Sequence, residues 1–186
     1  ELNRATSRTQ SALLEAMEEG QVTVDGTAHP VPQPFLVIAT QNPAGASGTQ
    51  LLPDSQLDRF MVRLSIGYPT ASDEADMVRR KQSGNPLERV EQVLDLDGLN
   101  ALRAQADAVH VSDPVLAYIV RLVGATREHP MLLQGASPRA TLAVTAMAKA
   151  AALVLGRDYV NPEDVRTVFS DVVSHRLIRS PRAQQD

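Results

Sequence analysis

One uninterrupted apolar run constrains the fold of this chain more than any other feature of its sequence. Residues 35–39 read Phe-Leu-Val-Ile-Ala, with Pro34 before them and Gln41-Asn42-Pro43 after them. A short run of this kind, bounded by turn residues, is typical of a strand that is buried on both faces of a parallel sheet. The sequence therefore predicts a central strand at 35–39 and an α/β core around it.

The residues before this strand predict a helix followed by a hairpin. Good helix formers dominate 7–19, and Gly20 is a stop signal for a helix. Two short extended pieces, 21–24 and 29–31, flank Asp25-Gly26, a dipeptide suited to a tight hairpin turn.

The residues after the strand continue the same core. Residues 43–53 are rich in Gly, Ser and Thr and predict a loop, whereas 54–60 predict a short helix. Apolar and polar side chains alternate over 62–66, as in a half-exposed strand. We expect this first part to end at Pro69.

Helical periodicity dominates the chain after Pro69. Ser137-Pro138 and Asn161-Pro162 each place a capping side chain before a proline at the first helical position. The fold class that we expect is a partial parallel α/β core with a β-hairpin over 1–69, followed by an all-α domain over 70–186. The predicted helices of the second part span 72–82, 96–108, 113–127, 137–155 and 162–177, with a frayed tail at 180–186.

Composition narrows the classes of function. A net charge of -4 predicts no broad basic surface, so we expect no nucleic-acid partner. No run approaches the ~18 apolar residues of a membrane-spanning helix, so we expect no membrane span. The chain has no cysteine, which excludes disulfides and thiolate metal sites and fits the cytoplasmic location that we expect. Its four histidines are scattered and lack the spacing of a metal pair.

Asn42 is the first candidate site residue, because it directly follows the predicted buried strand. Ligands of open α/β sheets bind beyond the carboxyl ends of the strands. Pro43 favours an extended backbone at Asn42, which would hold the amide at the strand tip. The alternative is a loop asparagine that caps a turn.

Two arginines are candidates for binding phosphate. Arg59 lies in Leu-Pro-Asp-Ser-Gln-Leu-Asp-Arg-Phe, where apolar neighbours can anchor it, and a guanidinium suits phosphate oxygens and transition-state charge. Its alternative is an ion pair with Asp54 or Asp58. Arg139 lies in the first turn of a predicted helix, where the helix dipole disfavours a cation but favours a bound anion. Its alternative is an ion pair with a nearby carboxylate.

Glu1 is a candidate general base, since a carboxylate just beyond a strand can polarise water. The alternative is an ordinary acidic residue. The phosphate-cradling motif GxxxxGK[ST] is absent from the sequence, and its two lysines, Lys81 and Lys149, lie in other contexts. The chain therefore lacks its own phosphate loop.

Six segments, taken in order, resemble the MoxR family of AAA+ ATPases. They are Glu1-Leu-Asn-Arg-Ala, Leu-Leu-Glu-Ala-Met-Glu-Glu, Gln-Val-Thr-Val-Asp-Gly, Ala-Thr-Gln-Asn-Pro, Leu-Pro-Asp-Ser-Gln-Leu-Asp-Arg-Phe and Gly-Ala-Ser-Pro-Arg-Ala. The resemblance covers nearly the whole chain. It implies that this is the C-terminal part of a AAA+ module, a fragment that begins at the Walker B glutamate and ends with the lid.

The resemblance also implies a role for each candidate. Glu1 matches the Walker B glutamate, Asn42 the sensor 1 asparagine, Arg59 the arginine finger and Arg139 the sensor 2 arginine of the lid. It implies ATP and Mg as cofactors, a hexameric ring, and chaperone-like action on partners, among them von Willebrand factor A domain proteins. Because the Walker A loop and the Walker B aspartate would precede Glu1, we expect the isolated chain to be inactive and to bind nucleotide weakly.

Two other functions remain open at this stage. A nucleic-acid-translocating AAA+ subunit would share the hairpin and the finger, but the hairpin residues 21–31 carry no Lys or Arg. A non-enzymatic adaptor would bind protein through the helices of 113–177. Salt-dependent DNA binding would favour the first, and ATPase activity that survives loss of Arg59 and Arg139 would favour the second.

Overall fold

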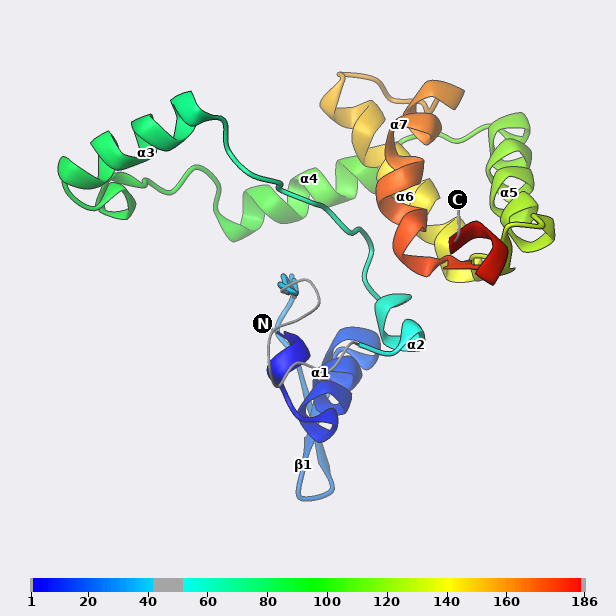
Figure 1. Cartoon of the computed structure of the whole chain (residues 1–186), viewed down its shortest axis with the longest axis horizontal. Coiled ribbons are helices and arrows are strands. Elements are labelled where there is room, and N and C mark those ends of the chain that lie inside the picture. Colours follow the sequence, from blue (N-terminus) through cyan, green and yellow to red (C-terminus); the bar gives the residue numbers. More distant parts are fainter. Residues whose placement is uncertain (1, 42–51, 185–186) are drawn as a thin grey trace.

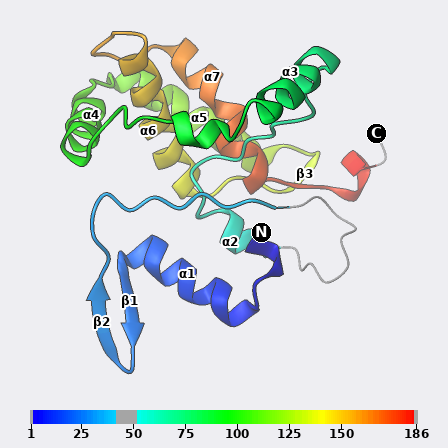
Figure 2. The same ribbon diagram turned by 90° about the vertical axis from the view of Figure 1, so that its left-hand side faces the viewer.

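The computed structural model describes residues 2–41 and 52–184, which form an N-terminal helix-hairpin unit and a larger helical body (Figure 1). The helix-hairpin unit comprises a 3-10 turn at Leu2–Arg4, helix α1 (Ser7–Glu19) and strands β1 (Gln21–Val24) and β2 (Thr27–Pro30). In Figures 1 and 2 this unit extends away from the helical body, with α2 between the two.

Local signals explain the helix-hairpin unit. The predicted helix 7–19 and first strand 21–24 are confirmed, whereas the second strand, predicted at 29–31, lies at Thr27–Pro30. The Thr6 side chain caps α1 by accepting a hydrogen bond from the Thr9 amide, and Gly20 ends α1 in the left-handed conformation at φ 64°. Asp25 and Gly26 both have positive φ, 49° and 79°, as a tight turn between antiparallel strands requires.

The two predicted strands of a parallel sheet do not form in the described residues. Residues 35–41 and 62–66 are extended but have no strand assignment, and the sheets of the described chain are two antiparallel pairs. Leu36 is 68% exposed and Ile38 is 88% exposed. A strand exists only where a neighbouring strand takes up its backbone hydrogen bonds. Here the contacts are isolated: the Leu2 amide donates to the Thr40 carbonyl at 3.1 Å and the Arg63 amide to the Asp171 carbonyl at 2.9 Å, but no described strand pairs with either run. The loop predicted at 43–53 lies mostly outside the described residues.

A short helix and a projecting helix connect the two parts. Helix α2 (Asp54–Leu57) is shorter than the predicted 54–60. Helix α3 (Ala71–Gln82) starts at a capping box between Thr70 and Asp73 and is followed by a 3-10 turn at Pro86–Arg89. All residues of α3 are exposed, and the helix stands away from the helical body in Figure 1.

Four helices make up the helical body, as predicted to within two residues at nearly every end. They are α4 (Leu96–Ala108), α5 (Asp113–Glu128), α6 (Pro138–Val154) and α7 (Pro162–Val173). The exception is the last helix, predicted to reach residue 177, which changes to a 3-10 turn at Ser174–Arg176. Ser137 caps α6 and Asn161 caps α7, each before a proline, as expected. No described helix is long and apolar enough to cross a membrane.

Two short strands in the helical body were not predicted. β3 (Leu132–Gln134) and β4 (Ile178–Arg179) pair antiparallel, so that the segment after α7 lies against the loop between α5 and α6. Strands of three and two residues are too short to show a period of two in sequence. The predicted tail at 180–186 contains a 3-10 turn, Pro181–Gln184, in its described part.

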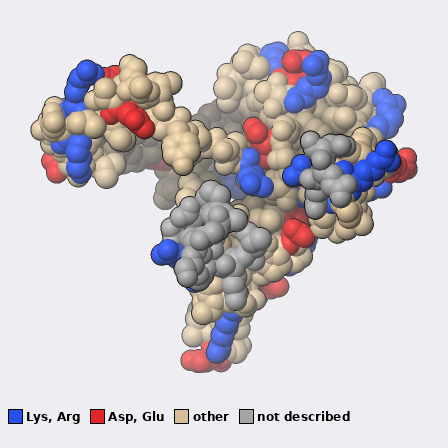
Figure 3. Space-filling view, viewed as in Figure 1, with Lys and Arg blue, Asp and Glu red and all other residues tan. Residues whose placement is uncertain are grey.

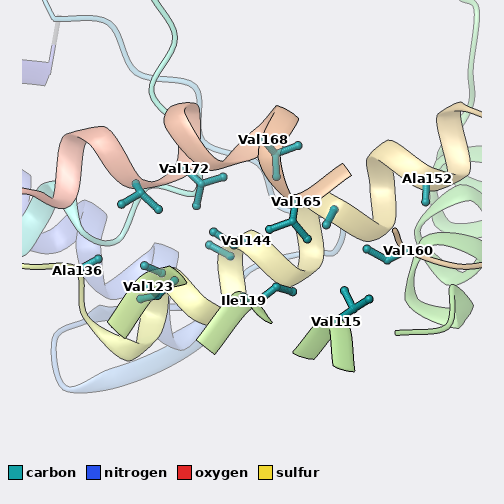
Figure 4. Close-up of a cluster of buried hydrophobic side chains, with 14 of the residues drawn as sticks. Val115, Ile119, Val123, Ala136, Val144, Ala152, Val160, Val165, Val168 and Val172 are labelled. Carbon is teal, nitrogen blue, oxygen red and sulfur yellow. The ribbon is translucent and has the colours of Figure 1, made fainter. Parts of the chain in front are cut away.

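The core of the helical body consists mainly of valine and alanine side chains between α5, α6 and α7 (Figure 4). Ile119 on α5, Val144 on α6 and Val165 on α7 are completely buried. Small side chains let the three helices approach one another closely. This core fixes the positions of the loop before α6 and of the turn after α7, and both contribute to the site described below.

We predict that Ile119→Ala lowers the free energy of unfolding by about 2–5 kcal/mol, because it removes buried carbon atoms and leaves a cavity. Urea unfolding followed by circular dichroism measures the loss. The matched control is Val120→Ala, since Val120 is the next residue of the same helix and is 56% exposed. Equal losses for the two variants would contradict the assignment of the core.

Candidate functional site

The structure brings together two of the four predicted site residues. Arg59 follows α2, Arg139 is the second residue of α6, and both form an ion pair with the carboxylate of Glu18 on α1. Glu1 and Asn42 lie outside the described residues, so their predicted roles stay predictions. Neither Asp54 nor Asp58, the alternatives considered for Arg59, is its partner in these ion pairs.

The backbone around α2 fixes the start of the Arg59 side chain. The Arg59 amide donates to the Gln56 carbonyl at 3.2 Å and the Phe60 amide to the Leu57 carbonyl at 3.1 Å, so the chain continues to turn after α2. The Arg59 side chain is partly buried, and its Nε is a buried donor without a hydrogen-bond partner among the described residues. Arg59 therefore keeps an unused donor beside its ion pair.

The loop before α6 positions Arg139. Gly135 packs against the backbone of α5, where a Cβ would lie 2.5 Å from the Arg127 nitrogen, so only glycine allows this approach. The next residue, Ala136, donates its amide to Thr126 Oγ1 at 3.0 Å, and its carbonyl accepts from Arg127 Nε at 2.8 Å. Helix α6 therefore starts at a defined place, with Arg139 in its first turn.

Asp58 holds the Arg59 segment against the start of α6. Its two carboxylate oxygens accept the Ser137 hydroxyl at 3.0 and 2.9 Å. Ser137 Oγ in turn accepts the Arg139 amide at 3.2 Å, and Arg139 Nη1 lies 3.5 Å from Asp58. The carboxylate next to Arg59 is thus bound to the cap of the helix that carries Arg139.

Arg176 completes this network from the turn after α7. Its side chain is 2% exposed, and it donates to Asp58 at 2.9 Å, to the Val172 carbonyl at 2.9 Å and to the Phe60 carbonyl at 2.6 Å. Its neighbour His175 bonds the same Phe60 carbonyl through Nε2 at 3.0 Å. These bonds attach the Arg59 segment to the helical body.

Burial lowers the pKa of two of these side chains. Burial lowers the pKa of the Arg176 guanidinium, whereas the charge and hydrogen bond of Asp58 raise it. Burial also lowers the pKa of His175, and the charges of Arg176 and Arg63 lower it further, against opposing contributions from the Phe60 carbonyl and Asp58. Since Nε2 donates to Phe60, the neutral ring leaves Nδ1 buried without a partner. Protonation of Nδ1 would place a cation beside two arginines.

The arrangement is suited to binding an anion. Two guanidinium groups that contact one carboxylate can also contact one phosphate, which offers similar oxygen acceptors and more charge. The donors present therefore fit a nucleotide phosphate. Among the described residues, no group of three or more His, Cys, Asp or Glu side chains gathers around a common point.

Comparisons with known sequences decide the family. Residues 1–62 match the family described as "ATPase family associated with various cellular activities (AAA)", and residues 124–186 match the family described as "AAA lid domain". The chain is 41% identical over 195 residues to "Chaperone MoxR1" of Mycobacterium tuberculosis, an alignment that covers 100% of this chain. The chain belongs to the MoxR family of AAA+ ATPases.

Two further relatives match nearly the whole chain. The MoxR-family chain is 42% identical over 184 residues to "Uncharacterized protein YeaC" of Bacillus subtilis, covering 99% of this chain. Its structure superposes on a putative ATPase from Cytophaga hutchinsonii with a TM-score of 0.92 and 38% identity, covering 100% of this chain and 59% of that one. The chain spans 51% of the length of the mycobacterial relative and 58% of the Bacillus relative.

Sequence reasoning missed Glu18 and Arg176, and it considered Asp58 only as a possible ion-pair partner of Arg59. Arg176 is 118 residues from Asp58, so no local spacing indicates their contact. Glu18 does carry a signal. It lies in the last turn of α1, where the helix dipole disfavours a carboxylate, so its position calls for a partner outside the helix.

We predict that Asp58→Ala destabilises the MoxR-family chain by about 3 kcal/mol, because it leaves the buried Arg176 charge without its carboxylate. Chemical denaturation measures the loss. Asp54→Ala is the control, since Asp54 is an exposed carboxylate at the start of α2, the short helix that Asp58 follows, and the loss for this variant should stay within about 0.5 kcal/mol. A loss for Asp58→Ala no larger than for the control would contradict the stabilising role of the bonds from Asp58 to Arg176 and Ser137.

We predict that His175 makes the folded state less stable as the pH falls. Its pKa in the folded state is lowered from 6.5, so the unfolded state binds the proton more readily. The contribution of neutral His175 is therefore complete above pH 6.5 and is lost as the pH falls through the lower pKa of the folded state. Unfolding curves between pH 7.5 and about 5 should show that His175→Gln loses less stability with falling pH than the wild type does, and an equal loss for both proteins would contradict the prediction.

Proposed function

We propose that this chain provides the arginine pair and the lid of an ATP-driven, chaperone-like factor that remodels or activates protein partners. One observation carries the proposal: Arg59 and Arg139, from segments far apart in sequence, meet at a single carboxylate. A site that gathers two guanidinium groups around one anionic group is equipped to grip a phosphate. The name "Chaperone MoxR1" of the mycobacterial relative supports the chaperone-like part of the proposal.

Each residue takes a defined part in this proposal. Arg59 acts as the arginine finger offered to a neighbouring subunit and Arg139 as the sensor 2 arginine of the lid. Glu1 acts as the Walker B glutamate that polarises water, and Asn42 acts as the sensor 1 asparagine. ATP with Mg supplies the phosphoryl bond that is hydrolysed, and these four residues bind, orient and stabilise charge around it.

The proposed assembly is a ring, most simply a hexamer, because an arginine finger works on nucleotide held by the next subunit. We propose a cytoplasmic location and a von Willebrand factor A domain protein as partner. The domain division at 69 and 70 is likewise proposed. The isolated chain should hydrolyse no ATP and bind nucleotide weakly, because its sequence contains no GxxxxGK[ST] loop.

A nucleic-acid motor is the alternative, and the distribution of charge supports it less. On the face shown in Figure 3, basic and acidic side chains are interspersed over a mostly uncharged surface. The hairpin between β1 and β2 carries no Lys or Arg. A protein that tracks nucleic acid needs several aligned phosphate contacts.

ATP hydrolysis by the protein at the full length of its MoxR relatives tests the proposal. Arg59→Ala should lower kcat by about 10³-fold, as expected for an arginine finger, and Arg139→Ala should raise the KM for ATP. Arg166→Ala is the control, since Arg166 is exposed and pairs with Glu163 on its own helix. If both site variants kept wild-type kcat and KM, the ATPase role of the pair would be wrong and a non-enzymatic adaptor would be favoured.

A further inference from the structure

The carboxylate between the two arginines belongs to the helix-hairpin unit, and the arginines belong with the helical body. Asp58 and Arg176 hold the Arg59 segment on the helical body, and Arg139 is part of α6. Glu18 lies in the last turn of α1, which packs mainly against β1. The contact therefore joins two parts of the molecule, with the arginines on one side and a single carboxylate on the other.

Glu18 is the polar side chain of α1 that reaches across this junction. The other described side-chain hydrogen bonds of α1 stay within residues 2–23; they are made by Thr9, Gln10, Ser11, Glu15 and Glu19. Figure 2 shows α1 and its hairpin along one side of the molecule and the helices along the other. Attachment of the helix-hairpin unit near Arg139 thus depends strongly on one carboxylate.

The side chains around Asp58 and Glu18 carry a net positive charge that a bound anion could balance. Arg59, Arg139 and Arg176 carry three positive charges against two carboxylates, those of Glu18 and Asp58. Asp58 is only 16% exposed and is also bound by Ser137, so it is fixed. The Glu18 side chain is 38% exposed and makes ion pairs that solvent screens, so it is the exchangeable member.

Glu18 is also held against the preference of its own helix. It lies at the carboxyl end of α1, where the dipole disfavours negative charge, and its partner Arg139 lies at the amino end of α6, where positive charge is disfavoured. A phosphate in place of Glu18 would relieve both conditions: it would put negative charge at the start of α6 and allow the carboxylate to move into water.

We propose that Glu18 gates the arginine pair, so that binding of a phosphate group to Arg59 and Arg139 and attachment of the helix-hairpin unit to the helical body exclude each other. This rests on the proposed function of the two arginines as a phosphate-binding pair. Because coupling is reciprocal, Glu18 weakens phosphate binding by the same factor by which phosphate weakens the attachment of α1. Occupancy of the pair is thereby converted into release of the hairpin.

A distance measurement on the 186-residue chain tests the gate. The chain contains no cysteine, so Ala12→Cys on α1 and Ala146→Cys on α6, both at exposed positions, accept spin labels at defined sites. Inorganic pyrophosphate is added at constant ionic strength, and its binding is followed by NMR. We expect pyrophosphate to lengthen and broaden the distance between the labels.

Substitutions at Glu18 and Glu19 test the role of Glu18 separately from phosphate binding by the two arginines. Glu18→Gln should show the longer distance without pyrophosphate and should bind pyrophosphate about tenfold more tightly, within the usual range of coupling between sites. Glu19→Gln is the matched control, because the Glu19 carboxylate accepts from Gln21 and should leave both measurements unchanged. Circular dichroism of each variant confirms that the helices are intact.

Each remaining outcome has one meaning. If Glu18→Gln binds pyrophosphate with wild-type affinity and the distance does not change, the gate is wrong while the phosphate site stands. If pyrophosphate binds neither wild type nor Glu18→Gln, or binds equally well after combined Arg59→Ala and Arg139→Ala, the phosphate-binding pair itself is wrong and the gate falls with it.

Discussion

The carboxylate of Asp58 is the point on which the arrangement of the site depends. It accepts hydrogen bonds from Ser137 and Arg176 and lies near Arg139, so the start of α6 and the turn after α7 converge on one acidic group from a third segment. A buried guanidinium is tolerated only when its donors are satisfied, and Asp58 provides the charge that compensates Arg176. Removal of this one acceptor would affect the turn after α7, the cap of α6 and the segment that carries Arg59 together.

The pairing of Glu18 with Arg139 combines two residues that are each unfavourable within their own helices. Helix dipoles favour acids at the start and bases at the end, and here the order is reversed in α1 and in α6. Charges placed in this way do not stabilise their own helices. Any stabilisation that they provide comes from the ion pair between the two helices. The same reversal provides donors at the start of α6, which is the physical basis for binding an anion there.

The sequence predicted local structure well and long-range structure poorly, for a physical reason. Helices α4 to α7 and the first hairpin are specified by capping residues, periodicity and turn dipeptides that act within a few positions. The runs at 35–39 and 62–66 require a neighbouring strand, and among the described residues they have none, so their apolar character alone does not make a sheet. Arg59 and Arg139 were identified by their chemical type and context, but their meeting at Glu18 depends on contacts between distant segments that no spacing encodes.

The docking of the Arg59 segment has a consequence for how the helical body can be isolated. Phe60 supplies the carbonyl that accepts from both His175 and Arg176, and Arg63 donates its amide to the Asp171 carbonyl at 2.9 Å. The surface of α7 and of the turn after it is therefore finished by residues that precede the helical part in the chain. Helices produced from residue 70 onward would retain their valine core. Without the backbone of Phe60 and Arg63, however, the side chains of His175 and Arg176 and the Asp171 carbonyl would lose hydrogen-bond partners. The smallest piece of the chain that would fold stably around this core thus begins near α2, before residue 70.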